Sequence, residues 1–327
     1  MPDRTRKHRR ATRDLFLGVD GGGTKTHSVI LSAEGELLAE DLSGPSNPFR
    51  TGLKNSADTI ALSAARACDK IGRTTGSIVS AVTGLAGVRR EDLRSEMRRL
   101  LSRELTHATL SVVTDAEIAL YAVLEKRSGL VVIAGTGSIV YGRNSRGRTA
   151  LAGGWGPIAG DEGGGVSIAI DALSAVARAS DGRGPKTELS KLAAEYFRSK
   201  SADDLVVAIY SPHVNFTRIA GFATSVARAA ARGDKTAVDI LSKAGTELGD
   251  AACAVVRELG MTRSAVEVGT VGGVFRSGEI VKRALEDQLS KCVRSMSFTD
   301  ALFSPAEAAA RMAYEQAFAK ITEKRKK

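Results

Sequence analysis

The sequence predicts an α/β protein that contains two similar domains. The chain has 327 residues, 43% of them hydrophobic, which is enough to bury a large core and suggests about two domains. One pattern also occurs twice: VDGGGTKTHSVILSAEGELLAE and IAGTGSIVYGRNSRGRTALAG each give an apolar strand, a glycine and hydroxyl turn, and further strand. From this duplication we expect two domains that face each other, with a ligand cleft between them.

Strands and helices alternate in the first half of the chain. LFLGVD (15–20) is apolar and ends at glycine, which is typical of a buried strand, and 27–41 continues as two strands around a turn at Glu34 and Gly35. A helix follows, because apolar residues recur close to every 3.6 positions, at Ile60, Ala64, Cys68 and Ile71. We then expect a strand and glycine loop at 77–87, an amphipathic helix at 91–105, and a strand, turn and helix start at 109–120.

The second half begins with the repeated pattern and is then mainly helical. Three strands are expected within 129–151. Alanine-rich amphipathic segments predict helices at 167–180, 187–198, 217–231 and 235–259, with one strand, 264–275, after them. The last helix, 305–324, begins with proline and has glutamate in its first turn, which favours helix initiation.

Composition and charge limit the class of protein. No apolar run approaches the roughly 20 residues that span a bilayer, and the basic first residues lack the apolar segment of a secretory signal. The formal charge is +10, but residues 1–14 carry +4 and 323–327 carry +3. We therefore expect basic, mobile ends rather than a specific nucleic-acid interface. The three cysteines are far apart and odd in number, which suggests a reducing compartment, no disulfide framework and no metal site.

The first glycine turn has the composition of an anion site. Glycines 21–23 let backbone N–H groups approach a ligand, and successive N–H groups in a tight turn form a concavity for anions. Thr24 adds a hydroxyl and Lys25 a positive charge, while Asp20 could hold Mg²⁺ through water. An ordinary hairpin turn is the alternative for this segment taken alone. The segment is neither GxxxxGK[ST] nor GxGxxG before a helix.

The second turn offers the same donors, at Gly135, Thr136, Gly137 and Ser138. Two such turns, one in each domain, could hold the phosphates of one nucleotide from opposite sides. A third glycine cluster, Gly272 and Gly273, follows a strand and could let an adenosine lie flat against the backbone. Taken alone, this last pair is also compatible with a simple turn at a strand end.

Asp115 follows the strand SVVT and begins the helix AEIAL. Phosphoryl transfer to a hydroxyl requires a base near the acceptor, and a helix start favours an ionised carboxylate. The alternative is that Asp115 only caps this helix. The position alone does not separate a base from a cap.

A glycine-rich segment, AGGWGPIAGDEGGG (152–165), is the candidate for sugar binding. It contains the single tryptophan, Trp155, among seven glycines, and Asp161 and Glu162 follow. Carboxylates accept hydrogen bonds from polyol hydroxyls, and an indole can pack on a pyranose face. Asn47, in GPSNP, could read a further hydroxyl or could serve only to form a turn.

Five of these segments, in this order, resemble the BadF/BadG-type sugar kinases: VDGGGTKT, TDAEIAL, VVIAGTGS, GGWGPIAGDEG and VGGVF. The resemblance covers roughly residues 15–320, and the family that it indicates includes N-acetylglucosamine kinases. It implies the fold of the actin, Hsp70 and hexokinase superfamily, which is two RNase H-like α/β domains with an interdomain nucleotide cleft. The implied division is a disordered basic tail (1–14), an N-terminal domain (15–121 with 304–322) and a C-terminal domain (122–303).

The resemblance also implies roles for individual residues. ATP would be held by Thr24, Lys25, Gly135, Thr136, Gly137, Gly272, Gly273 and, near the adenine, Ala220 in RIAGFA. Mg²⁺ would be bound near Asp20 through water. The sugar would be held by Asn47, Gly154, Trp155 and Asp161, with Asp115 as the catalytic aspartate. One departure is the final helix, which begins SPAEAAA where the family tends to have glycine.

The resulting functional prediction is a cytoplasmic, ATP- and Mg²⁺-dependent kinase that phosphorylates an amino sugar or hexose, on the 6-hydroxyl of N-acetylglucosamine as first candidate. A glucosamine kinase or a broad hexokinase is the alternative. By analogy we expect a homodimer with a small-molecule sugar substrate, no specific nucleic acid and no membrane. A dehydratase-activating ATPase would need cysteines spaced for an iron–sulfur cluster, and a sugar-responsive repressor would need a helix-turn-helix before the first strand. Neither feature is found in this sequence.

Overall fold

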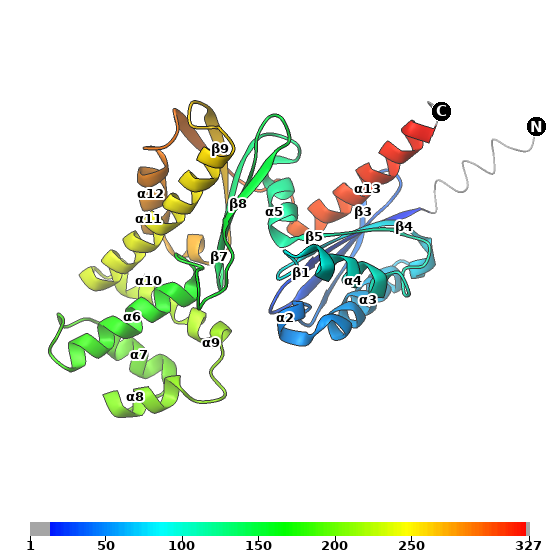
Figure 1. Ribbon diagram of the computed structural model, residues 1–327. Helices are drawn as coiled ribbons and strands as arrows, with labels where there is room; N and C mark the ends of the chain where they lie inside the picture. Colours follow the sequence, from blue (N-terminus) through cyan, green and yellow to red (C-terminus); the bar gives the residue numbers. More distant parts are fainter. Residues whose placement is uncertain (1–13, 325–327) are drawn as a thin grey trace, which may run out of the picture. The chain divides into compact units, whose positions relative to one another are not determined.

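The computed structural model describes residues 14–324 and divides them into two compact units (Figure 1). The first unit contains the described residues up to Lys126 together with the segment from Ala301 onward, and the second extends from Arg127 to Asp300. The expected basic tail, 1–14, lies outside the described residues except for Asp14, as do the last three residues of the chain. No helix among the described residues is both long and apolar enough to cross a bilayer.

The first unit contains a five-stranded sheet in the order β3-β2-β1-β4-β5. Strands β1, β2 and β3 are antiparallel neighbours, whereas β1, β4 and β5 are parallel. The carboxyl ends of these three parallel strands therefore meet at one edge of the sheet. The strands are β1 (Leu15–Gly21), β2 (Thr26–Leu31), β3 (Leu37–Ser43), β4 (Ile78–Leu85) and β5 (Thr109–Thr114).

Helices cover both faces of this sheet (Figure 1). Alternate side chains of β1 point to opposite faces, so Leu15, Leu17 and Val19 pack against α3 and α4, while Phe16 packs against α13. The helices of the unit are α2 (Pro48–Thr51), α3 (Leu53–Asp69), α4 (Glu91–Leu101), α5 (Asp115–Leu124) and α13 (Pro305–Lys324), with a 3₁₀ turn, η1 (Thr75–Ser77).

The final helix approaches the sheet closely at Gly18, although the helix itself starts with SPAEAAA. A Cβ atom on Gly18 would lie 2.1 Å from the carbonyl oxygen of Ala306 and 2.1 Å from the backbone nitrogen of Ala310. The small residue that permits close packing is therefore on the strand. Alanines 306, 309, 310 and 313 are fully buried against it.

The second unit repeats this sheet topology, with strand order β10-β9-β6-β7-β8. Its first three strands are antiparallel neighbours, and β6, β9 and β10 are parallel. The duplication inferred from the two glycine turns therefore extends to all five strands of each sheet. The strands are β6 (Gly129–Ala134), β7 (Ser138–Arg143), β8 (Thr149–Gly153), β9 (Ala265–Val271) and β10 (Ser295–Thr299).

Helices pack around this second sheet and form one apolar cluster with it. The expectation of a single strand after residue 167 is wrong, because β10 follows β9 with α12 between them. The expected helix at 217–231 is also two helices, and α8 was not expected. The helices are α6 (Gly165–Ser180), α7 (Leu189–Phe197), α8 (Ala202–Ile209), α9 (Phe216–Gly221), α10 (Ala223–Ala231), α11 (Lys235–Glu258) and α12 (Glu279–Leu289), with a 3₁₀ turn, η2 (Val274–Ser277).

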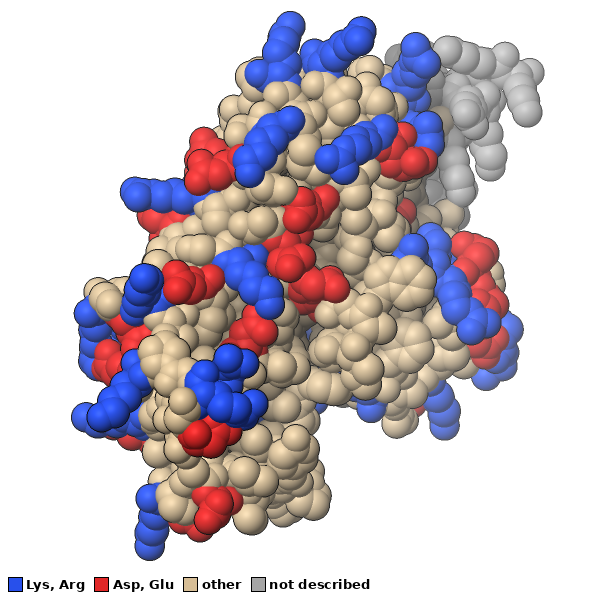
Figure 2. All heavy atoms as spheres, turned by 60° about the vertical axis from the view of Figure 1, so that its left-hand side comes forward, with Lys and Arg blue, Asp and Glu red and all other residues tan. Residues whose placement is uncertain are grey.

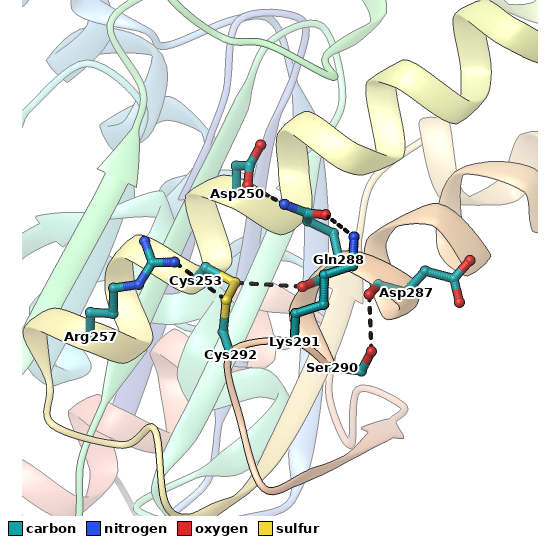
Figure 3. The surroundings of a disulfide bond; sticks show 8 residues. All are labelled: Asp250, Cys253, Arg257, Asp287, Gln288, Ser290, Lys291 and Cys292. Atoms are coloured by element: carbon teal, nitrogen blue, oxygen red, sulfur yellow. Dashed lines mark hydrogen bonds between the residues drawn. A yellow bond between two sulfur atoms is a disulfide. The ribbon is translucent and has the colours of Figure 1, made fainter.

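A disulfide bond joins Cys253 of α11 to Cys292, which follows α12 (Figure 3). The expectation that the cysteines form no disulfide is therefore wrong, and the inference of a reducing compartment loses its support. Cys68 is free and fully buried on α3. Chain distance hid the pair: 39 positions separate two cysteines that α11 and α12 bring together by packing against each other.

Candidate active site

In the first unit, candidate residues gather where the parallel strands end. Asp20 and Gly21 end β1, and Asp115 begins α5 directly after β5. The register pairs Asp20 with Gly84 of β4, and Gly84 in turn with Val113 of β5. The topology therefore places both carboxylates at one edge of this sheet, which is where open α/β sheets bind ligands.

The first glycine turn is held by backbone hydrogen bonds at that edge. The N–H of Gly22 donates to the carbonyl of Lys25 at 3.0 Å, and the carbonyl of Gly22 accepts from the N–H groups of Ser46 and Asn47, each at 3.1 Å. Thr24 and Lys25 are exposed at the tip of the turn. Their hydroxyl and ammonium groups are thus presented to solvent, as an anion site requires.

Asn47 lies beside this turn and caps α2. Its Oδ1 accepts from the N–H of Phe49 at 2.9 Å, so the turn-forming role considered for this residue is observed. The Nδ2 group and the second lone pair of Oδ1 are what it could offer to a sugar hydroxyl. Arg50, which is not among the predicted site residues, donates from Nη1 to the carbonyl of Gly23 and so supports the glycine turn. The feature of the sequence that could have indicated this role is a basic residue three positions after the cap residue Asn47.

The helix cap at α5 is Thr114 rather than Asp115. The Oγ1 of Thr114 accepts from the N–H of Glu117 at 3.3 Å, and the Glu117 carboxylate accepts from the N–H of Thr114 at 2.7 Å. This reciprocal pair satisfies the helix start. Within the described chain, the Asp115 carboxylate accepts only from local backbone N–H groups, that of Ala116 at 3.0 Å and its own. The capping role considered for Asp115 is therefore performed by its neighbour.

The two carboxylates of this edge are electrostatically coupled. Burial raises the pKa of Asp115 to about 6, and the charge of Asp20 adds to the shift. Burial also raises the pKa of Asp20, against the opposing effects of His27 and Lys25. A divalent cation between such groups would offset their repulsion, and Mg²⁺ uses one or two carboxylates with phosphate oxygens and water as its other ligands. No set of three or more candidate metal-binding side chains occurs within residues 14–324.

In the second unit, the turn between β6 and β7 forms a second concave loop. The N–H of Gly135 donates to the carbonyl of Gly137 at 2.9 Å. The N–H groups of Gly165 and Val166, at the start of α6, donate to the carbonyls of Gly135 and Thr136 at 2.8 and 3.0 Å. The start of α6 thus fixes the loop, while the Thr136 side chain remains exposed.

Two further candidates for nucleotide binding lie against this loop. Gly272 has φ +117°, and a Cβ there would lie 2.2 Å from the carbonyl oxygen of Ala134 and 3.0 Å from the nitrogen of Gly135. Only glycine fits this approach of two backbones. A Cβ on Gly165 would lie 3.2 Å from the Cβ of Ala220, so α9 also reaches the loop. Gly273 follows directly and is exposed.

Asp161 packs against the same loop at Gly137. It is buried, adopts the left-handed backbone region at φ +58°, and its Oδ1 accepts from the N–H of Gly156 at 3.1 Å. A Cβ on Gly137 would lie 2.0 Å from its Oδ2. Burial raises the pKa of this carboxyl, with the nearby Glu162 charge acting in the same direction. Its oxygens therefore lie against the loop as well as beside the tryptophan segment.

Trp155 is 69% exposed, so it does not fill the core. Gly154, before it, is exposed with φ +69°, and a Cβ there would lie 2.8 Å from the Cδ1 of Ile139. An exposed indole on a glycine-rich segment is available to a ligand.

Each unit therefore assembles its own part of the predicted site. The first brings together Asp20, Thr24, Lys25, Asn47 and Asp115, and the second brings together Gly135, Thr136, Gly137, Gly154, Trp155, Asp161, Ala220, Gly272 and Gly273. That both parts act on one nucleotide and one sugar remains a prediction.

Two α/β units of one topology, each with a glycine turn after its first strand, define the actin-like ATPase class of fold. A candidate N-acetylglucosamine kinase from Porphyromonas gingivalis has this fold, with a TM-score of 0.72, 22% identity, and coverage of 92% of this chain and 99% of that one. A ROK family glucokinase from Streptomyces griseus, solved with glucose and AMPPNP, has a TM-score of 0.58 and 17% identity, with coverage of 92% of this chain and 99% of that one. These structures confirm the predicted fold class.

The chain belongs to the BadF/BadG/BcrA/BcrD ATPase family, whose model matches residues 17–313. An N-acetylmuramic acid/N-acetylglucosamine kinase from Clostridium acetobutylicum is 37% identical over 261 residues, 80% of this chain and 85% of that protein. An N-acetyl-D-glucosamine kinase from Dictyostelium discoideum is 31% identical over 295 residues, 86% and 90%. The family predicted from the five motifs is confirmed, and both relatives are of the enzyme class that the sequence predicts.

Proposed function

We propose that this protein is an ATP-dependent kinase that transfers the γ-phosphoryl group to a hydroxyl of an N-acetylated amino sugar, with the 6-hydroxyl of N-acetylglucosamine as first candidate. The observation that supports it most is Asp115: a carboxylate at a sheet edge, relieved of capping by Thr114, with a pKa raised to about 6. A base whose pKa lies near neutral pH is ionised at the working pH and still accepts a proton readily.

The catalytic step assigns the proton to a single carboxylate. As the sugar oxygen attacks the γ-phosphorus, Asp115 accepts the hydroxyl proton, the bond from the γ-phosphorus to the β,γ-bridging oxygen breaks, and ADP leaves. The burial that raises the Asp115 pKa also limits competing water at the base. Positioning and electrostatics supply most of the catalysis in phosphoryl transfer.

The two glycine turns would bind the phosphates of ATP through backbone N–H groups, with the hydroxyls of Thr24 and Thr136 and the charge of Lys25 added. Gly272, Gly273 and Ala220 would contact the adenosine, because small residues there let the nucleotide approach the backbone. Mg²⁺, held through water by Asp20, would offset negative charge on the phosphates when bound.

Sugar selection would depend on Asn47, Trp155 and Asp161, which offer an amide, an exposed ring and a carboxylate. The two relatives support an N-acetylated substrate, and one of them carries N-acetylmuramic acid in its name. A glucosamine kinase or a broad hexokinase would use the same catalytic aspartate and differ only in this selection. A homodimer completes the proposal. A cytoplasmic location is not part of it, because the Cys253–Cys292 disulfide removes the argument for a reducing compartment.

A substrate panel tests this function. The protein is incubated with Mg-ATP and, separately, N-acetylglucosamine, N-acetylmuramic acid, N-acetylmannosamine, glucosamine, glucose or no sugar, and ADP release is followed. We expect an N-acetylated sugar to raise turnover far above the blank, and mass spectrometry with NMR of the product to place the phosphate on O6. ADP release that is the same with and without sugar would refute the kinase assignment.

A further inference from the structure

A basic hollow of about 710 Å³ opens on the second unit, beside the ends of α11 and α12. Four of its residues carry positive charge and none carries negative charge. Figure 2 shows lysine and arginine side chains gathered at the upper end of this face of the molecule. The lining consists of Arg257, Thr262, Arg263, Lys291, Cys292, Val293 and Arg294.

The hollow lies at the opposite end of the sheet from the candidate nucleotide loop. Its residues precede the first residues of β9 and β10, Ala265 and Ser295, whereas Gly272 follows the last residue of β9. β9 has seven residues, and a strand rises about 3.3 Å per residue, so roughly 20 Å separates the two ends. The hollow is therefore a separate site from the one proposed for ATP.

Within residues 14–324 none of the four cations forms an ion pair, and two carboxylates that neighbour them in the sequence pair with other arginines. Glu258 pairs with Arg148, and Glu267 pairs with Arg127. Lys291 donates instead to the Oε1 of Gln288 at 2.8 Å, and Arg257 donates to the Sγ of Cys292 at 3.5 Å.

The walls of the hollow are fixed in place. The disulfide from Cys253 to Cys292 ties the loop after α12 to α11, as Figure 3 shows together with Arg257 and Lys291. The Nδ2 of Asn144 donates to the carbonyl of Leu259 at 3.0 Å and secures the end of α11. Because the backbone that carries these cations is held, less backbone entropy is lost when a ligand binds, which favours affinity.

We propose that this hollow binds a small phosphorylated anion. Guanidinium groups form paired hydrogen bonds with phosphate oxygens, and the Thr262 hydroxyl adds a neutral donor. The volume is within the range of small-molecule sites, which favours a compact ligand. A cation in the last turn of a helix interacts favourably with the helix dipole, which accounts for Arg257 of α11. This explanation does not apply to Arg263 and Arg294, which lie beyond the ends of α11 and α12.

Calorimetric titration with inorganic tripolyphosphate, at constant ionic strength and with AMPPNP saturating the nucleotide site, tests the proposal on the full protein. The variant is Arg263→Glu with Arg294→Glu, both exposed loop positions. The control is Lys186→Glu with Lys200→Glu, which makes the same change of charge at exposed positions elsewhere in the second unit. A melting curve for each variant verifies the fold.

We expect one tripolyphosphate to bind the parent and the control with equal affinity, and the Arg263 and Arg294 variant to bind at least tenfold more weakly. Equal affinity for all three proteins, or absence of binding to the parent, would overturn the proposal. A 20-nucleotide oligonucleotide is titrated in the same way. If it binds the parent more tightly than tripolyphosphate does, and binds the Arg263 and Arg294 variant more weakly, the ligand is a nucleic acid and the proposal of a small anion is wrong.

Discussion

Burial and the neighbouring charge of Asp20 together raise the pKa of Asp115 to about 6. Asp20 lies at the end of β1 and Asp115 follows β5, and only β4 separates these parallel strands, so the sheet itself sets the proximity of the two carboxylates. A carboxylate that is costly to ionise, and that no helix cap requires, is a strong indication of function rather than of stability.

Replacement of Asp115 by asparagine should abolish sugar-dependent ADP release while the protein still binds nucleotide. The amide cannot accept the proton, and loss of a general base typically costs about 10²- to 10⁴-fold in rate. Steady-state kinetics and a nucleotide-binding titration measure the two quantities. Asp69→Asn, an exposed aspartate at the end of α3, is the control and should retain full activity. An Asp115→Asn enzyme within threefold of the parent would exclude the base role.

The pH dependence of kcat/KM should follow the ionisation of Asp115. The pKa is raised, so the carboxylate is protonated and inactive below about pH 6 and ionised above it. We expect kcat/KM to fall about tenfold per pH unit below 6 and to be level above it, with all buffers at one ionic strength. A limb that is centred near 4, the ordinary range for aspartate, would contradict the geometry.

Gly137→Ala should weaken nucleotide binding by disturbing the second glycine turn. A Cβ there would lie 2.0 Å from the Oδ2 of Asp161, so either the loop or the buried carboxylate must move. Overpacking of this kind typically costs about 1–3 kcal/mol, which also lowers the melting temperature. Gly44→Ala is the matched control, because a Cβ at that position would have no neighbour within 4 Å and its φ is not positive. Equal nucleotide affinity for the two variants would refute the role of Gly137.

Replacement of Cys253 and Cys292 by alanine should destabilise the protein. A cross-link that closes a loop of 39 positions contributes about 4 kcal/mol in the chain-entropy treatment. Thermal unfolding of the double variant against the unreduced parent measures the loss. The matching chemical test is alkylation of the unreduced protein, in which Cys68 is the one free thiol. Because Cys68 is buried and burial raises its pKa to about 11, it should react only after denaturation. Three reactive thiols in the denatured, unreduced protein would show that the bond does not form.

The sequence was sufficient for features that depend on local composition. An apolar strand followed by a glycine-rich turn appears in the sequence at Val19 and Asp20 and again at Ile133 and Ala134, and both became strands that lead into turns. The helix at 305–324 was also predictable, because a proline start and a continuous run of helix formers are local signals.

Features that depend on tertiary contact were not predictable. β10 has the sequence SMSFT and pairs only with β9, so as an edge strand it needs no continuous apolar run. The cap at α5 illustrates the same limit within the site: Thr114 and Asp115 are both good cap residues, and only the hydrogen bonds distinguish them. The disulfide required the packing of α11 against α12.

The central claim is that the glycine turns of both units bind one triphosphate. Hydrogen–deuterium exchange of the protein with and without Mg-AMPPNP measures this directly. We predict slower exchange at the backbone amides of Gly21–Thr26 and Gly135–Ser138 together, with the same dependence on nucleotide concentration. Protection of one turn alone, or protection of the two turns with different midpoints, would contradict the claim.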